Sequence, residues 1–242
     1  LAYVDPAKST AGLTSLVGEP FLGLDENVQI KYSSTPGGTN PLYSVFSEIS
    51  GTQNLVASST CLDIMYGTGA SFDDLRITVF YDTIANADYF GNVQGDYTSS
   101  IPISQLSLPN ALTGANNSSW KDKPSKAAAA PVKLISDYES YFLQAEAAAR
   151  GVNVGVLSAA GYYSAGIEAN YLAYGLTAGD ASAYIATHPY PVSGTPDQQI
   201  EAIISQKWYS MCGNQGNEAW TEYRRTGYPN VLVESANSFI GS

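Results

Sequence analysis

The sequence predicts a mainly α-helical protein in which a loop-rich segment, residues 1–130, precedes a helical segment, residues 131–242. Two observations support this prediction. Glycine, proline and asparagine interrupt the first segment at short intervals, whereas after Pro131 apolar residues recur at steps of three and four. The first pattern is typical of turns and the second of amphipathic helices. The length of 242 residues allows one large domain or two small ones.

The loop-rich segment contains turn signals such as residues 35–38 (Thr-Pro-Gly-Gly) and residues 108–110 (Leu-Pro-Asn). Only short apolar runs separate these signals, for example residues 77–81 (Ile-Thr-Val-Phe-Tyr). We therefore expect a few short strands and helices here, with less than one third of the residues in helices.

Two long helices are predicted at the start of the helical segment. The first has an apolar face that runs from Leu134 through Phe142 to Ala149, and Gly151 follows as a left-handed cap. The second begins after the capping residue Ser158 and ends at Gly175.

A third helix has the clearest start, because Thr195 and Gln198 form a capping box and Pro196 stands in the first turn. Its apolar face includes Ile204 and Trp208 and it stops at Gly213, and a short fourth helix covers about residues 217–224. We expect these helices to stack as antiparallel pairs of the tetratricopeptide kind, although the sequence does not show a tetratricopeptide repeat consensus.

Composition excludes some partners. The formal net charge is −11 and no basic run occurs, which argues against binding to nucleic acid or anionic lipid. Charged residues make up only 14 %, while 18 residues are tyrosine. Such a neutral, aromatic, hydroxyl-rich surface suits a sugar or a peptide. No run of about 20 apolar residues is present, so no transmembrane segment is expected.

The sequence offers little catalytic or metal-binding chemistry. His188 is the only histidine, and no cluster has zinc-ligand spacing. No cofactor is expected. Five aspartates could supply oxygen ligands to calcium, but no twelve-residue loop pattern supports a calcium site. These aspartates are Asp73, Asp74, Asp82, Asp88 and Asp96. For Cys61 and Cys212, two buried apolar thiols are favoured over a single bridge.

Several stretches resemble the SusD/RagB-like family of outer-membrane nutrient-binding lipoproteins. Residues 138–151 contain an aromatic-Leu-x-Ala-Glu-Ala core and a terminal glycine, and residues 162–170 are similar to the next family helix. More specific are Gln-Lys-Trp at residues 206–208 and the Glu-Ala-Trp and Arg-Arg-Thr-Gly-Tyr-Pro motifs within residues 217–229. Weaker marks are residues 40–43 and 73–76, where Leu75 replaces the usual proline.

The resemblance implies a function for the intact protein. It would bind a polysaccharide or oligosaccharide at the cell surface, without catalysis, for import through a SusC-like TonB-dependent transporter. Family members carry an N-terminal lipid anchor and are longer at both ends, so this chain is expected to be part of a single SusD-like domain. Alternatives are an oligopeptide or another nutrient as ligand, a glycoside hydrolase, and a helical scaffold that binds only protein.

Two groups of residues carry expectations about roles. Arg224 and Arg225, with Glu218 and Glu222, are expected to tie helices together rather than to clamp an anionic ligand. Glu146 is expected to form a helix-to-helix hydrogen bond or to pair with a lysine or arginine, rather than to act as a catalytic carboxylate. Trp208 and Trp220 are expected in the core because they lie on helical faces.

The ligand site is predicted in the loop-rich segment, on aromatic residues that have no apolar periodicity to bury them. The candidates are Trp120, Tyr89 and Tyr97, with Asn92 between the two tyrosines and Gly91 and Gly95 allowing close approach to the backbone. The alternative is that these aromatic side chains pack against the helical layer.

Overall fold

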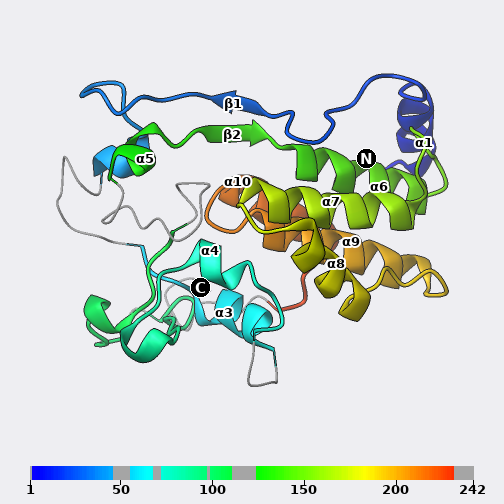
Figure 1. Ribbon diagram of the computed structural model, residues 1–242. Helices are drawn as coiled ribbons and strands as arrows, with labels where there is room; N and C mark the ends of the chain where they lie inside the picture. The colour runs from blue at the N-terminus through cyan, green and yellow to red at the C-terminus, as the bar shows by residue number, and fades with distance from the viewer. Residues whose placement is uncertain (1, 46–54, 68–71, 97–98, 111–123, 232–242) are drawn as a thin grey trace, which may run out of the picture.

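The computed structural model describes residues 2–45, 55–67, 72–96, 99–110 and 124–231. The loop-rich segment contains α1 (Pro6–Thr14), β1 (Val28–Ile30), α2 (Pro41–Tyr43), α3 (Ser59–Tyr66), α4 (Ile77–Phe80), the 3₁₀ turns η2 (Ala85–Ala87) and η3 (Ile103–Gln105), and α5 (Pro124–Ala129). The helical segment contains β2 (Val132–Ile135), α6 (Asp137–Ala149), α7 (Ala159–Ala173), α8 (Ala178–Thr187), α9 (Pro196–Ser210) and α10 (Gly216–Thr226). Figure 1 shows α6, α7, α9 and α10 as a central layer, with the β1–β2 ribbon along one side and α3 and α4 on the other.

The helical segment confirms the predicted helix pairs. α6 and α7 pack along each other and are joined by a short loop, so they form an antiparallel hairpin. Gly166 permits the two helices to approach closely, since a Cβ atom at that position would lie 2.9 Å from the Phe142 ring. α9 packs against α6 and α10, and α8 packs against α7.

Side chains cap these helices, and for α7 and α9 they do so at the positions that the sequence predicts. Ser136 and Ser158 accept hydrogen bonds from the third residue of α6 and α7, respectively. Thr195 and Gln198 form the full capping box of α9. These bonds satisfy backbone N–H groups that a helix start leaves without intrahelical partners.

The predicted start of the first long helix was wrong. Leu134 was placed on its apolar face, but this residue lies in β2, is half exposed, and precedes the Ser136 cap. Residues 132–135 pair antiparallel with residues 28–30 instead, with Ile30 opposite Val132. This pairing joins segments about a hundred residues apart, which the local apolar pattern does not reveal.

A helix that was not predicted follows Gly175. Thr177 caps α8 by accepting a hydrogen bond from the Asp180 backbone N–H, and the Asp180 carboxylate accepts one from the Thr177 backbone N–H, which completes a capping box. The helix buries Ala181 and Tyr184 against the central layer. The helix has few large apolar residues, so the spacing of apolar residues did not predict it. The Thr-x-x-Asp spacing at its start does indicate a capping box.

The buried side chains form two clusters. One lies between the helices of the helical segment and is built around Tyr138, Phe142, Ile167, Ile203 and Ile204. The other lies below it and joins α3 and α4 to the end of α7 through Leu62, Met65, Phe80, Tyr89 and Tyr174. Among the described residues before Pro131, helices are short, and the nine-residue α1 is the longest.

One buried arginine connects the loop-rich segment to the helical layer. Arg76 is fully buried, and its guanidinium pairs with Asp74 at 2.6 Å. It also donates to the side-chain oxygens of Asn170 in α7 and Gln206 in α9. Tyr171 donates its hydroxyl hydrogen to Asp74 at 3.0 Å. Leu75, between these two charged residues, is exposed.

Candidate functional site: a buried charge network and an aromatic cavity

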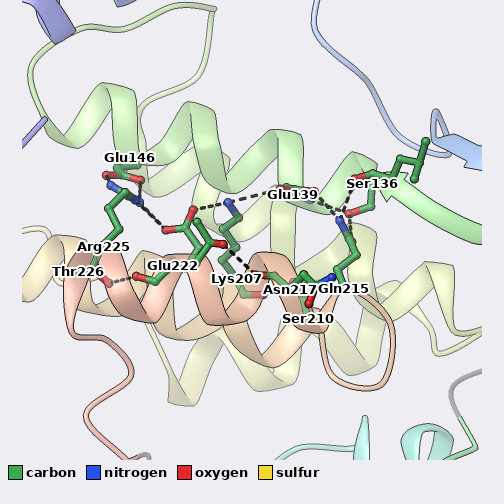
Figure 2. A network of polar contacts seen from close by, with 12 residues as sticks. Ser136, Glu139, Glu146, Lys207, Ser210, Gln215, Asn217, Glu222, Arg225 and Thr226 are labelled. Atoms are coloured by element: carbon green, nitrogen blue, oxygen red, sulfur yellow. Dashed lines mark hydrogen bonds and ion pairs between the residues drawn. The ribbon is translucent and has the colours of Figure 1, made fainter. Parts of the chain in front are cut away.

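Acidic and basic side chains form a row between α6 and α10 (Figure 2). The ammonium group of Lys207 in α9 lies 2.8 Å from Glu222 of α10 and 3.5 Å from Glu139 of α6, and all three residues are buried. Gln215 continues the row, because its side-chain amide donates to Glu139 at 2.6 Å and its carbonyl accepts from Ser136. A single lysine therefore joins three helices.

The other end of the row is a bidentate ion pair. Both terminal nitrogens of Arg225 lie 2.7 Å from the Glu146 carboxylate, which also accepts from Arg150 at 2.8 Å. Burial alone would raise the pKa of Glu146, but the hydrogen bonds and the positive charges of Arg225 and Arg150 together outweigh it and the pKa is lowered. The Glu146 carboxylate is thus held charged between two arginines.

The row consists of ion pairs and hydrogen bonds between helices. Glu146, Glu222 and Arg225 tie helices together, and their polar groups are directed at one another. The expectation that Glu218 and Arg224 also tie helices together was wrong, because both are exposed on α10. The Arg224 guanidinium instead lies 5.8 Å from the centre of the Trp220 ring.

The predicted binding residues have different locations. Trp120 and Tyr97 lie outside the described residues. Tyr89 was expected to be exposed, but it is only 8 % exposed and packs edge-on against Tyr66 and Phe72. For Tyr89 the structure therefore agrees with the packing alternative.

Asn92 and Gly91 contact another part of the chain. The backbone N–H of Asn92 donates to Ala57, and its carbonyl accepts from Ser59. A Cβ atom on Gly91 would lie 2.6 Å from the Ser59 nitrogen. The close approach that glycine permits here is consequently between two chain segments.

The expected burial of the two helical tryptophans was wrong. Trp220 is 54 % exposed, and Trp208 is half buried. Both line a cavity of about 330 Å³ between α9, α10 and the α3–α4 region. The phase of α10 explains the exposure, because its buried residues are Ala219 and Glu222, so Trp220 lies off the buried face.

The cavity walls are mainly apolar, with a few polar groups. Phe80, Met211 and Trp208 supply apolar surface, and Gln94 and Ser58 supply polar groups. The Ser58 hydroxyl is buried and has no hydrogen-bond partner among the described atoms. An exposed indole beside apolar walls and scattered hydroxyl and amide groups is suited to a sugar, which presents an apolar C–H face and a rim of hydroxyls.

A second cavity, of about 770 Å³, lies between α1, α6 and the β ribbon. Its walls include Leu13, Leu16, Phe21 and Leu143, and its charged residues are Glu26, Glu146, Arg150, Glu222 and Arg225. The last four already pair with one another, and Glu26 accepts a hydrogen bond from the backbone N–H of Gly23. Phe21 is its one aromatic lining residue among those described, so it matches a sugar less well than the tryptophan-lined cavity.

No three histidine, cysteine, aspartate or glutamate side chains gather as a metal-ligand set within the described ranges. The possibility of calcium on the five aspartates therefore gains no ligand set there. Of the helices that the structure describes, none is long and apolar enough to cross a membrane.

The chain matches the SusD-like family model described as "Starch-binding associating with outer membrane" over residues 1–240. It therefore belongs to the SusD-like family. No curated protein matches it significantly. The mainly α-helical fold with tetratricopeptide-like helix pairs, predicted from the sequence, is the fold of its solved relatives.

Two solved structures illustrate the similarity. A SusD homologue from Bacteroides vulgatus is 27 % identical with a TM-score of 0.74, and the match covers 99 % of this chain and 50 % of that one. A chitin-binding SusD homologue from Flavobacterium johnsoniae is 25 % identical with the same TM-score of 0.74 and the same coverage of 99 % and 50 %. The chain thus spans about half the length of these relatives.

Proposed function

We propose that the intact protein binds a polysaccharide or oligosaccharide at the outer membrane and delivers it to a SusC-like TonB-dependent transporter. Membership of a starch-binding family and the similarity to a chitin-binding relative support a carbohydrate ligand. In this proposal the protein is lipid-anchored at the cell surface and forms a lid that opens to take up ligand and closes over the transporter.

The cavity lined by Trp208 and Trp220 is the proposed sugar site of this chain. The observation that carries this assignment is the exposure of Trp220, 54 %, at the mouth of an otherwise apolar cavity. One sugar ring would stack on the indole, while Gln94 and the Ser58 hydroxyl would face its hydroxyls. The site replaces the predicted platform at Tyr89, which is buried.

Catalysis is not part of the proposal. A glycosidase needs two carboxyl groups that flank the scissile bond and are free to exchange protons or attack carbon. The buried carboxylates of the row, on Glu139, Glu146 and Glu222, each face lysine or arginine. An oligopeptide remains the alternative ligand, because a peptide also presents apolar groups and hydrogen-bonding amides.

Titration of the protein with a malto-oligosaccharide and a chito-oligosaccharide, followed by calorimetry, tests the site. Trp220→Ala should lower the affinity more than tenfold, about 1.4 kcal/mol. The melting temperature should stay within a few degrees, since an exposed side chain contributes little to packing. Leu143→Ala, in the larger cavity, is the matched control and should bind as the wild type does.

Three results would contradict the assignment. The first is unchanged affinity of Trp220→Ala, and the second is loss of binding in Leu143→Ala, which would place the site in the larger cavity. The third is no sugar affinity in the wild type together with binding of a peptide mixture. Trp120→Ala belongs in the same series, because Trp120 and Tyr97 remain sequence predictions.

A further inference from the structure

Cys61 and Cys212 are 151 positions apart in the sequence, yet both line the tryptophan cavity. Cys61 lies in α3, and Cys212 follows the end of α9. Both are free thiols and half buried. We infer that these two cysteines are a paired redox site, in which a low-molecular-weight disulfide oxidises both thiols to an intrachain bridge that joins the loop-rich segment to the helical layer.

The first supporting observation is the polar contact between the two elements. The Tyr81 hydroxyl, at the end of α4, lies 2.9 Å from the Cys212 sulfur. It also hydrogen-bonds to Cys61, and this bond contributes to lowering the pKa of the Cys61 thiol. One hydroxyl group therefore contacts sulfur atoms from both segments.

The second observation is the asymmetry between the thiols. Hydrogen bonding from Cys212 lowers the pKa of Cys61 more than burial raises it. The reciprocal bond and burial raise the pKa of Cys212. A thiolate is the attacking species in thiol–disulfide exchange, so Cys61 is assigned as the attacking residue and Cys212 as the resolving one.

The third observation is access. The cavity opens beside the exposed Trp220, so a small disulfide can reach the sulfurs without unfolding of the protein. The Cys61 thiolate attacks one sulfur of the reagent, which breaks its S–S bond and releases one thiol. Cys212 then loses its proton and attacks the Cys61 sulfur, which releases the second thiol. The protein dithiol is oxidised and the reagent disulfide is reduced to two thiols.

Glutathione disulfide at pH 8, followed by acid quenching and intact-mass measurement, tests this inference. The wild type should lose two hydrogens, carry no glutathione, and show no free thiol after denaturation. Its melting temperature should be higher than that of the reduced protein, because the bridge restricts the unfolded chain. A wild type that keeps both thiols, carries stable glutathione adducts or forms linked dimers would overturn the proposal.

Single serine variants test the assigned order. Cys212→Ser should accumulate one glutathione on Cys61, because no resolving thiol remains. Cys61→Ser should react much more slowly, since Cys212 is a weak attacking group. Equal rates in the two variants, or the reverse order, would contradict the assignment. If a variant does not fold, as judged by circular dichroism, the wild-type mass result decides alone. Sugar affinity is measured separately, so this inference can fail while the proposed function stands.

Discussion

At the scale of single residues, Glu146 shows how charge is used inside the helical layer. Its lowered pKa means that folding favours the ionised carboxylate, which Arg225 and Arg150 hold. A group whose pKa is lower in the folded state stabilises the protein above its unfolded value and loses that contribution as pH falls. We therefore expect Glu146→Gln to be less stable than the wild type at pH 7, and the difference to shrink below pH 4.5.

Urea unfolding at pH 7, 5, 4 and 3 measures this difference. Glu218→Gln is the matched control, because Glu218 is exposed on α10 and should change stability by less than about 0.5 kcal/mol. If the variant Glu146→Gln loses the same free energy of unfolding at every pH, the loss comes from poorer packing of the amide and not from the missing charge.

The sequence indicates that a buried charge needs a partner more readily than it indicates which residues are exposed. For Glu146 in its alanine-rich helix, a hydrogen bond to another helix or a pair with a cation was expected, and in the structure Arg225 and Arg150 contact its carboxylate. Exposure depends on which elements cover a residue, and that is not a local property. Tyr89 in a glycine-rich stretch is covered by Tyr66 and Phe72, whereas Trp220 in a helix has part of its ring uncovered.

At the scale of elements, the starts of α7 and α9 were predictable because a cap is local chemistry over four residues. Thr195→Ala should destabilise the protein by about 1 kcal/mol, because the Gln198 backbone N–H loses its acceptor. Thr195→Ser keeps the hydroxyl and should retain most of the stability. Chemical denaturation measures both, and equal loss in the two variants would show that the Thr195 methyl group, not the cap, matters.

The sequence did not reveal that β1 and β2 pair with each other. β2 reads locally as the first turn of a helix, and only its partner residues 28–30 make it a strand. Likewise, residues 77–81 have the β-branched and aromatic composition of a strand, but Ile77–Phe80 form a short helix that buries Ile77, Val79 and Phe80. Tertiary packing overrides propensity in both cases.

At the scale of the whole molecule, the loop-rich segment is held to the helical layer by the second apolar cluster and by Arg76. No local pattern in residues 73–76 indicates that this arginine would be fully buried, because its partners Asn170 and Gln206 lie about a hundred residues away. Burial lowers the pKa of an arginine, but the charge and hydrogen bond of Asp74, together with Tyr184 and Tyr171, outweigh it here and the pKa of Arg76 is raised. The guanidinium is thus charged although it is fully buried.

Breaking the Arg76–Asp74 pair should allow the loop-rich segment to detach from the helical layer at a lower urea concentration than the one that unfolds the helices. Arg76→Met leaves the Asp74 carboxylate buried without its cation, which costs about 3–5 kcal/mol. We expect the double variant Asp74→Asn/Arg76→Met to be more stable than Arg76→Met alone, because it buries no unpaired charge. Far-ultraviolet circular dichroism reports the helices, and the protection of backbone amides in α3 and α4 from hydrogen exchange reports the contact between the segments. In the wild type both should change at one urea concentration, whereas in Arg76→Met the amides of α3 and α4 should lose protection first. Coincident transitions in Arg76→Met would show that the second apolar cluster alone holds the segments together.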